Sequence, residues 1–282
     1  MAISNPFSVP RRRALQALGG AALGGWRLGR PNPADAQECT ILSSPALTEG
    51  PYFVDEDLHR GDIRTDPATG VLSSGVPLSL AINVSQLSNC AVAPLVGAVV
   101  DIWHCDAAGV YSDVGQNNST GSKFLRGYQM TNRGGNVYFY TVYPGWYQGR
   151  AVHIHVKIRT ISNYSETYEF TSQFFFDEDF TDRVYRAEPY SARGLRDTRN
   201  STDGIYSGGS SLGSTTVSNA GSLLLTTLRE RSGWIEADAK LVVDLSLGSS
   251  PDQTQGGGGP GGGAPPGGGP PPGGGPPPGG GA

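Results

Sequence analysis

The chain has 282 residues, of which 42 are glycine and 21 are proline, and it carries a formal net charge of −4 at pH 7. An acidic chain without a basic stripe is not typical of nucleic-acid-binding proteins, so we expect no nucleic-acid partner. No segment approaches the ~18 consecutive apolar residues of a membrane helix, so we also expect no membrane span.

The first 36 residues have the pattern of an export signal. Arg11, Arg12 and Arg13 precede a short, mildly apolar run at 14–23, and residues 34–36 (ADA) form a small-x-small cleavage pattern. This arrangement is typical of the twin-arginine route, so we expect a periplasmic, cell-surface or secreted protein. A cytoplasmic protein with a basic N-terminus is the alternative. The signal holds five of the 21 basic and one of the 25 acidic residues, so the remainder has a net charge of −8.

Residues 37–250 are enough for one domain with a sizeable core. Short β-rich runs separated by turn residues occupy 78–84, 98–103, 137–142, 174–176 and 241–245. Helical periodicity is weak and suggests a turn or two only within 223–231, while the apolar-poor stretch 187–221 is expected to pack as a cover. The pattern predicts an all-β fold, an antiparallel β-sandwich with long covering loops.

The run 150–159 (RAVHIHVKIR) alternates and predicts a further strand. Its aliphatic residues share one face, which places His153 and His155 together on the other. Two imidazoles two residues apart on a strand point the same way, as a metal chelate requires. The chain has only four histidines, but two solvent-facing strand residues are the simpler alternative.

Residues 251–282 differ in composition from the domain. Positions 256–282 comprise 16 glycines, 9 prolines and 2 alanines, which offer almost no side-chain surface to bury. We predict a disordered extension, because such a segment cannot offset its ordering entropy. Runs such as 256–259 break the strict glycine period that a collagen helix needs.

Two of the 12 tyrosines combine with His153 and His155 into one candidate metal site: Tyr111, which follows residues 109–110 (GV), and Tyr147, which follows residues 144–146 (PGW). Phenolate oxygen is a hard, anionic ligand, and ionising a tyrosine at pH 7 costs about 4 kcal/mol. A strongly Lewis-acidic cation must offset that cost for both tyrosines, which favours Fe(III). Zn(II) more often takes histidine, cysteine or carboxylate, and Cu(II) suits two phenolates less well.

Several segments resemble motifs of the intradiol ring-cleavage dioxygenases, over a match that extends from about residue 48 to 179. The segments are 47–53 (LTEGPYF), 95–112 (LVGAVVDIWHCDAAGVYS), 144–147 (PGWY), 150–155 (RAVHIH) and 172–176 (SQFFF). A further stretch, 196–206 (RDTRNSTDGIY), is similar to secreted members of the family.

The resemblance implies a role for each site residue. Tyr111, Tyr147, His153 and His155 would be the Fe(III) ligands, with Tyr147 the tyrosine that leaves when substrate binds. Arg150 would stabilise the anion that develops on the substrate ring, and Tyr52 and Gln173 would line the substrate pocket. The implied reaction is cleavage of a catechol-type ring between its two hydroxylated carbons by O₂, which gives a muconate-type diacid without an organic cofactor. His104, although it lies in a motif, is not in the family's ligand set, and we interpret it as structural.

Two departures from the family pattern leave properties open. The segment 148–152 is short and has Gly149 where protocatechuate-type members carry tryptophan, so the substrate's identity is open. Few residues precede Tyr52 in the mature chain, so the N-terminal dimerisation region of catechol 1,2-dioxygenases has no room, and the oligomeric state is open. Cys39, Cys90 and Cys105 allow one disulfide in three pairings. The alternative function is a secreted β-sandwich binding module without iron.

Overall fold

The computed structural model describes residues 43–162, 165–212 and 215–247. The predicted export signal, Cys39 and the Gly/Pro-rich tail lie outside the described residues. Every helix in the described part is too short or too polar to span a bilayer.

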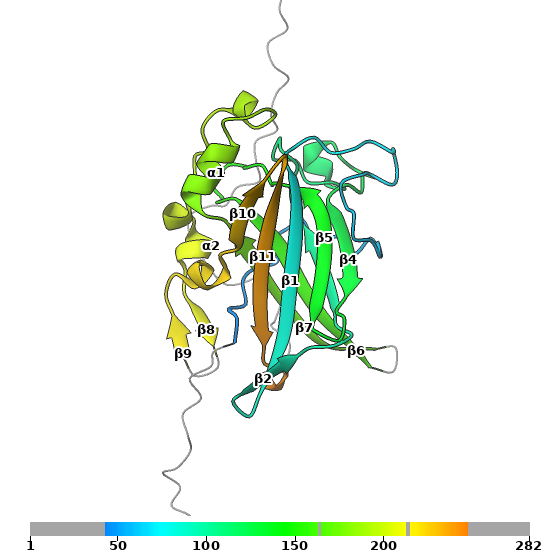
Figure 1. Cartoon of the computed structure of the whole chain (residues 1–282), viewed down its shortest axis with the longest axis vertical. Helices are drawn as coiled ribbons and strands as arrows, with labels where there is room; N and C mark the ends of the chain where they lie inside the picture. Colours follow the sequence, from blue (N-terminus) through cyan, green and yellow to red (C-terminus); the bar gives the residue numbers. More distant parts are fainter. Residues whose placement is uncertain (1–42, 163–164, 213–214, 248–282) are drawn as a thin grey trace, which may run out of the picture. The chain divides into compact units, whose positions relative to one another are not determined.

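Two β-sheets form the body of the molecule (Figure 1). The five-stranded sheet contains β10 (Thr227–Arg231), β11 (Trp234–Val243), β1 (Pro77–Ser88) and β2 (Ala91–Pro94), with β5 (Asn136–Val142) also paired to β1. The four-stranded sheet has the order β4 (Arg126–Met130), β3 (Val99–Trp103), β6 (His153–Ser162) and β7 (Ser165–Phe175). Pairing among the described strands is antiparallel except between β1 and β11, which are parallel.

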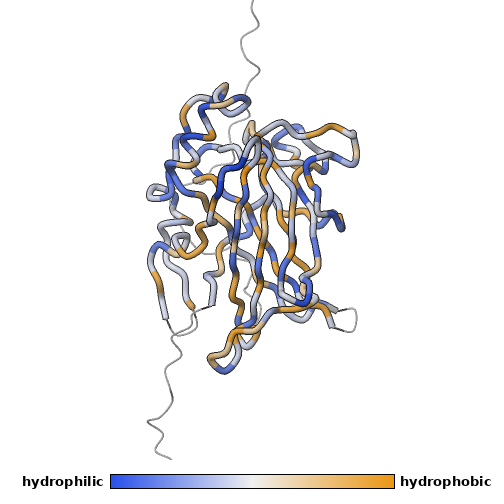
Figure 2. Tube along the Cα trace, viewed as in Figure 1, coloured by the Kyte–Doolittle hydropathy of each residue, from blue (hydrophilic) through white to orange (hydrophobic). Residues whose placement is uncertain are grey.

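The core lies between the inner faces of these sheets. Alternate residues of β1 are buried there, and residues of β6 pack into the same apolar cluster; they are Leu78, Leu80, Ile82, Val84, Ile154, Val156 and Ile158, each at most 1% exposed. Hydropathy accordingly alternates along the long strands (Figure 2). This arrangement confirms the predicted β-sandwich, with the parallel β1–β11 pair as its one departure among the described strands.

The outer face of the four-stranded sheet is also covered. His153, His155 and Lys157 lie on that face of β6 and are 2%, 1% and 5% exposed. The N-terminal segment 43–60 lies across it: Leu47 N–H donates to the Thr171 carbonyl of β7, and Arg60 N–H donates to the Tyr128 carbonyl of β4, at the opposite edge of the sheet. Strand β6 is thus buried on both faces, and its polar side chains point into the protein and not toward solvent.

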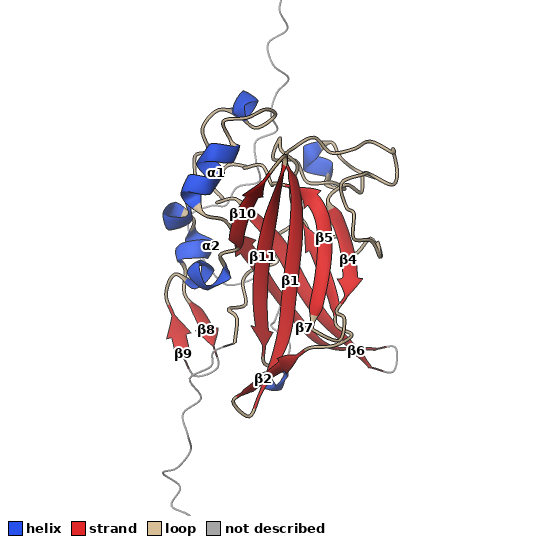
Figure 3. Ribbon diagram, in the orientation of Figure 1, coloured by secondary structure: helices blue, strands red, loops and turns tan. Residues whose placement is uncertain are grey.

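Short helices follow β7 and lie to one side of the sheets (Figure 3). Helix α1 (Glu178–Val184) begins after Asp177, whose Oδ1 accepts a hydrogen bond from Phe180 N–H at 2.7 Å. The predicted cover at 187–221 contains the 3₁₀ helices η3 (Ser191–Arg193) and η4 (Asn200–Thr202), helix α2 (Gly204–Ser207) and the strands β8 (Ser210–Leu212) and β9 (Thr215–Val217). The helical turn expected within 223–231 is confined to the end of η5 (Ala220–Leu224), because β10 occupies residues 227–231. Two other 3₁₀ helices are η2 (Gly115–Asn117) and η6 (Leu245–Leu247).

Candidate active site

The structure brings the four predicted ligands together. His153 and His155 come from β6, Tyr111 from the loop after β3, and Tyr147 from the loop that leads into β6. The Nε2 atom of His153 lies 3.0 Å from His155 Nε2, 3.2 Å from Tyr147 Oη and 3.4 Å from Tyr111 Oη. Every one of these side chains is buried.

Hydrogen bonding identifies the free nitrogen of His153. Its Nδ1 lies 2.6 Å from the Ala151 carbonyl oxygen, and since a carbonyl can only accept, Nδ1 carries the proton. Nε2 is therefore unprotonated, and its lone pair is free to bind a metal beside the Oη atoms of Tyr111 and Tyr147 and the Nε2 atom of His155. Burial lowers the pKa of His153 and of His155 well below the ordinary value, so both rings are neutral, as metal ligation requires.

The tyrosines are also neutral in the absence of a cation. Burial raises the pKa of Tyr147 to about 12, although the nearby Arg150 charge lowers it. Burial and the neighbouring Tyr147 raise the pKa of Tyr111 well above its ordinary value. Only a strong local positive charge would ionise both phenols, and a bound metal cation would supply it.

The donor set fits a metal ion. Metal–nitrogen and metal–oxygen bonds of about 2.0–2.2 Å place neighbouring donors about 3 Å apart, and the spacings around His153 Nε2 are 3.0–3.4 Å. Among the described residues there is no group of three or more histidine, cysteine, aspartate or glutamate side chains that could hold a metal. A metal at this position would therefore need the two phenols.

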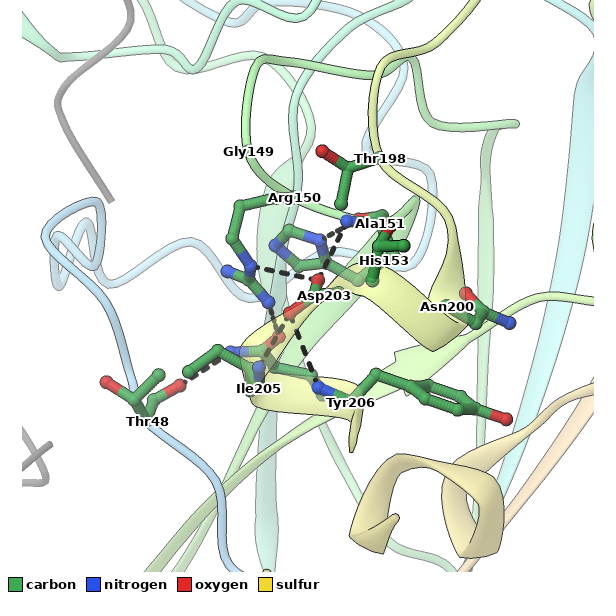
Figure 4. Close-up of polar contacts among 12 residues, drawn as sticks. Thr48, Gly149, Arg150, Ala151, His153, Thr198, Asn200, Asp203, Ile205 and Tyr206 are labelled. Atoms are coloured by element: carbon green, nitrogen blue, oxygen red, sulfur yellow. Dashed lines mark hydrogen bonds and ion pairs between the residues drawn. The ribbon is translucent and has the colours of Figure 1, made fainter. Parts of the chain in front are cut away.

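Arg150 lies beside this cluster and makes three side-chain contacts, of which Figure 4 shows the one with Asp203. Its Nη1 is 3.5 Å from Tyr147 Oη, its Nη2 donates to Gln173 Oε1 at 2.5 Å, and its Nε donates to Asp203 Oδ2 at 3.1 Å. Gln173 is fully buried and also donates through Nε2 to the Thr48 carbonyl at 2.8 Å. Both ends of the Gln173 amide are therefore engaged within the protein, next to the predicted pocket.

Asp203 is the site residue that sequence reasoning missed. It lies in the segment 196–206 that resembles secreted family members, but no role was assigned to it there. The available signal was local: an aspartate before glycine and isoleucine is a good helix N-cap, and Asp203 does cap α2. Its contact with Arg150 spans 53 positions and has no signature in the sequence.

Aromatic rings form the wall of the site. Tyr52 is 4% exposed, stacks on Tyr111 with ring centroids 4.5 Å apart, and meets Tyr147 edge-on at 6.2 Å. Trp103 stacks on His155 at 4.8 Å with an interplanar angle of 6°. The buried Trp103 ring therefore helps to fix the plane of one imidazole.

His104 and Cys105 are buried and bonded elsewhere. His104 Nδ1 donates to the Cys105 carbonyl at 2.8 Å, and its Nε2 lies 2.7 Å from Thr141 Oγ1, which agrees with a structural role. The Cys105 thiol is free and donates to the Gly145 carbonyl at 3.4 Å. Of the three disulfide pairings, those that use Cys105 are therefore absent, and Cys39 lies outside the described residues.

The chain is similar to known proteins in sequence and in fold. A protein-family model described as a dioxygenase matches residues 48–189, about half of the chain. An intradiol ring-cleavage dioxygenase from Tetranychus urticae is 29% identical, with a TM-score of 0.61, over 75% of this chain and 98% of that one. The dioxygenase domain of a dioxygenase carbohydrate-binding protein fusion from Streptomyces sp. SirexAA-E is 27% identical, with a TM-score of 0.48, over 72% and 98%.

No curated protein sequence matches the chain significantly. The matched segment 48–189 nevertheless holds the four converging side chains together with Tyr52, Arg150 and Gln173. The chain therefore belongs to the intradiol ring-cleavage dioxygenase family.

Proposed function

We propose that the enzyme is a non-haem Fe(III) dioxygenase that cleaves catechol-type rings between the two hydroxylated carbons to give muconate-type diacids. The observation that carries the proposal is the convergence of two phenol oxygens and a second imidazole on His153 Nε2, at 3.0–3.4 Å. Family members typically use non-haem Fe(III). Held by Tyr111, Tyr147, His153 and His155, ferric iron would supply the Lewis acidity that ionises phenols and catechol and makes the ring reactive toward O₂.

Tyr147 is the proposed proton acceptor. We expect its Oη to take a proton from the incoming catechol hydroxyl and to move aside as a neutral phenol. Arg150 Nη1, 3.5 Å from that oxygen, then faces the substrate oxygen that replaces it. A fixed guanidinium in a buried pocket stabilises negative charge on either group, and so lowers the barrier as charge develops on the ring.

Tyr52 is the proposed wall against which the substrate ring packs. It is held by Tyr111 on one side, and the segment that carries it covers the outer face of the sheet. Gln173 contributes by accepting a hydrogen bond from Arg150 Nη2, which fixes that side chain. Because these side chains are buried, water is excluded and the electrostatic contacts among them are strengthened.

Oxygen uptake tests the proposal. Both atoms of O₂ enter the product, so the reaction is balanced without a reductant and should consume one O₂ per catechol. With ¹⁸O₂, the iron-loaded enzyme is expected to give a diacid that carries two labelled atoms, across a panel of substituted catechols. The variant His155→Gln should lose this activity, whereas His59→Gln, at an exposed position stacked on Tyr128, should retain it.

The colour of the purified protein separates this function from an iron-free binding module. Tyrosinate bound to Fe(III) absorbs visible light, so the enzyme should be reddish and lose its colour with a chelator. A colourless protein that binds catechols but takes up no oxygen after loading with iron would refute the proposed function.

A further inference from the structure

Asp203 joins the covering segment to the site through a fully buried carboxylate. Its Oδ1 accepts hydrogen bonds from Ile205 N–H at 2.7 Å and Tyr206 N–H at 3.3 Å, at the start of α2. Its Oδ2 accepts from Arg150 Nε at 3.1 Å and from Ala151 N–H at 2.7 Å (Figure 4). One side chain thus receives four N–H groups from two segments that are remote in sequence.

The guanidinium of Arg150 is clamped from two sides by these contacts. Asp203 holds Nε, and Gln173 Oε1 holds Nη2 at 2.5 Å. A planar guanidinium fixed at two nitrogens has little freedom to turn, so Nη1 must point toward Tyr147 Oη. The clamp removes rotamer freedom that the arginine side chain would otherwise lose when it meets the substrate.

The negative charge of Asp203 explains how the Arg150 guanidinium can stay charged at a largely buried position. The Arg150 side chain is 14% exposed and that of Asp203 is 0% exposed, so both charges are largely removed from water. Each compensates the other, and four N–H donors satisfy the carboxylate. Because the partner contacts Nε and not Nη1, the face of the guanidinium toward Tyr147 stays available.

We propose that Asp203 is a positioning residue for ring cleavage, which holds the Arg150 guanidinium against Tyr147 and so against the substrate oxygen that replaces it. The inference rests on the proposed function, in which Arg150 stabilises the anion that develops on the ring. Asp203 acts through Arg150 and does not touch the substrate. Through Asp203, the covering segment contributes to catalysis in addition to covering the sheet.

The variant Asp203→Asn tests this role. Asparagine is as good an N-cap as aspartate, so α2 should be retained. The amide has only one oxygen, so its NH₂ must face either the N–H groups of Arg150 and Ala151 or those of α2. We expect kcat/KM for catechol to fall about 10- to 100-fold, with iron content unchanged. The matched control is Asp177→Asn, which alters the N-cap of α1 and should stay within about twofold of wild type.

Two readouts separate positioning from general damage. Anaerobic titration with catechol, followed by absorbance, should give a dissociation constant within about threefold of wild type, because the lost contact acts on charge that develops later. In a double-mutant cycle, Asp203→Asn should cost less than about twofold in an Arg150→Ala background. Arg150→Lys keeps the charge but not the fork of donors, so its kcat/KM should fall as much as that of Asp203→Asn. If Asp203→Asn fails to fold, Arg150→Lys tests the clamp independently.

Several outcomes would overturn the inference. They are wild-type turnover in Asp203→Asn, wild-type turnover in Arg150→Lys, full additivity in the cycle, or loss of iron from Asp203→Asn, which would mean that Asp203 supports the ligand strand instead of Arg150. Failure of the proposed function looks different, because the iron-loaded wild type would then consume no oxygen with any catechol. In that case the role of Asp203 in ring cleavage falls with it.

Discussion

Tyr147 and Tyr111 both face His153 but differ in their other contacts. Tyr147 Oη has Arg150 Nη1 at 3.5 Å, whereas Tyr111 packs under Tyr52 and is 1% exposed. A phenol beside a guanidinium, at the edge of the cluster, is better placed to exchange with an incoming hydroxyl than one enclosed by rings. For this reason we propose Tyr147, and not Tyr111, as the tyrosine that exchanges with the substrate.

Removing the Tyr147 hydroxyl should alter both colour and turnover. In Tyr147→Phe we expect the visible band to shift, because one of the two proposed charge-transfer ligands is lost. The catechol turnover should fall at least about 100-fold, because the proton acceptor is lost with it. Tyr140→Phe, on an exposed tyrosine of β5, is the control. Full activity in Tyr147→Phe would contradict the assignment.

His104 should make stability depend on pH. Burial lowers its pKa from 6.5 to about 4. The unfolded chain therefore takes up a proton between pH 6.5 and 4 that the folded protein resists, and the free energy of unfolding falls as pH falls through this window, by about 3 kcal/mol in all. Urea denaturation of His104→Gln in the same metal state should lack this component, and His59→Gln should keep it. Parallel pH profiles for wild type and His104→Gln would contradict the prediction.

Residues within one motif were predictable, and residues that act across segments were not. Alternation along 150–159 places His153 and His155 on one face, and the resemblance adds the two tyrosines and Arg150. The partner of Arg150 lies 53 positions away, on a four-residue helix, and nothing in its own surroundings marks it as part of a site.

At the scale of elements, the N-terminal segment 43–60 acts as a strap that carries Tyr52. It is fastened by Lys157 of β6, whose Nζ pairs with Glu49 and, at 3.1 Å, with Glu169. The same ammonium lies 3.9 Å from the centroid of the Phe53 ring. Glu49 and Phe53, which lie close to Tyr52 in the sequence, therefore both contact β6, the strand that supplies both imidazoles.

Replacing the lysine should loosen this strap. Lys157→Met keeps much of the side-chain volume but leaves the glutamates without their cation, and we expect the free energy of unfolding to fall by about 3 kcal/mol. The KM for catechol should rise several-fold, because Tyr52 is no longer fixed against Tyr111. Arg231→Met, which removes an ion pair on an exposed strand, should change stability by less than about 1 kcal/mol. An unchanged KM in Lys157→Met would show that the strap is held by other contacts.

Elements whose identity depends on distant contacts were the ones that the sequence misplaced. No helix was expected from the sequence after the strand run at 174–176, but Asp177 caps α1, and Glu178 pairs with Arg196 and Arg199 of the covering segment. The weak helical pattern in 223–231 gave way to β10 because Leu228 packs against the core. The parallel β1–β11 pair joins the first and last long strands and follows from chain topology, which local alternation does not encode.

At the scale of the molecule, the sandwich has two different outer faces. The five-stranded sheet exposes Tyr138 and Tyr140 of β5, whereas the outer face of the four-stranded sheet is closed by the strap and by the covering segment. The proposed site lies under that cover and draws its residues from several segments. The geometry of the site therefore depends on the whole sandwich.

Residues 251–282 lie outside the described residues, so the disorder expected of this tail stays a prediction.

Export by the twin-arginine route is tested on the full chain. Changing Arg11, Arg12 and Arg13 together to lysine should leave the protein inside the cell as an uncleaved precursor, because the route recognises the arginine pair and not charge alone. Arg27→Lys with Arg30→Lys, later in the same segment, is the control and should be exported and processed. Equal export of both variants would contradict the twin-arginine assignment.

The central claim is a ferric ion held by two phenols and two imidazoles, and anomalous diffraction at the iron absorption edge tests it most directly. Crystals of the iron-loaded enzyme should show one strong peak. That peak should lie about 2.0–2.2 Å from each of Tyr111 Oη, Tyr147 Oη, His153 Nε2 and His155 Nε2. A peak elsewhere, or none in crystals of protein that still cleaves catechol, would contradict the account.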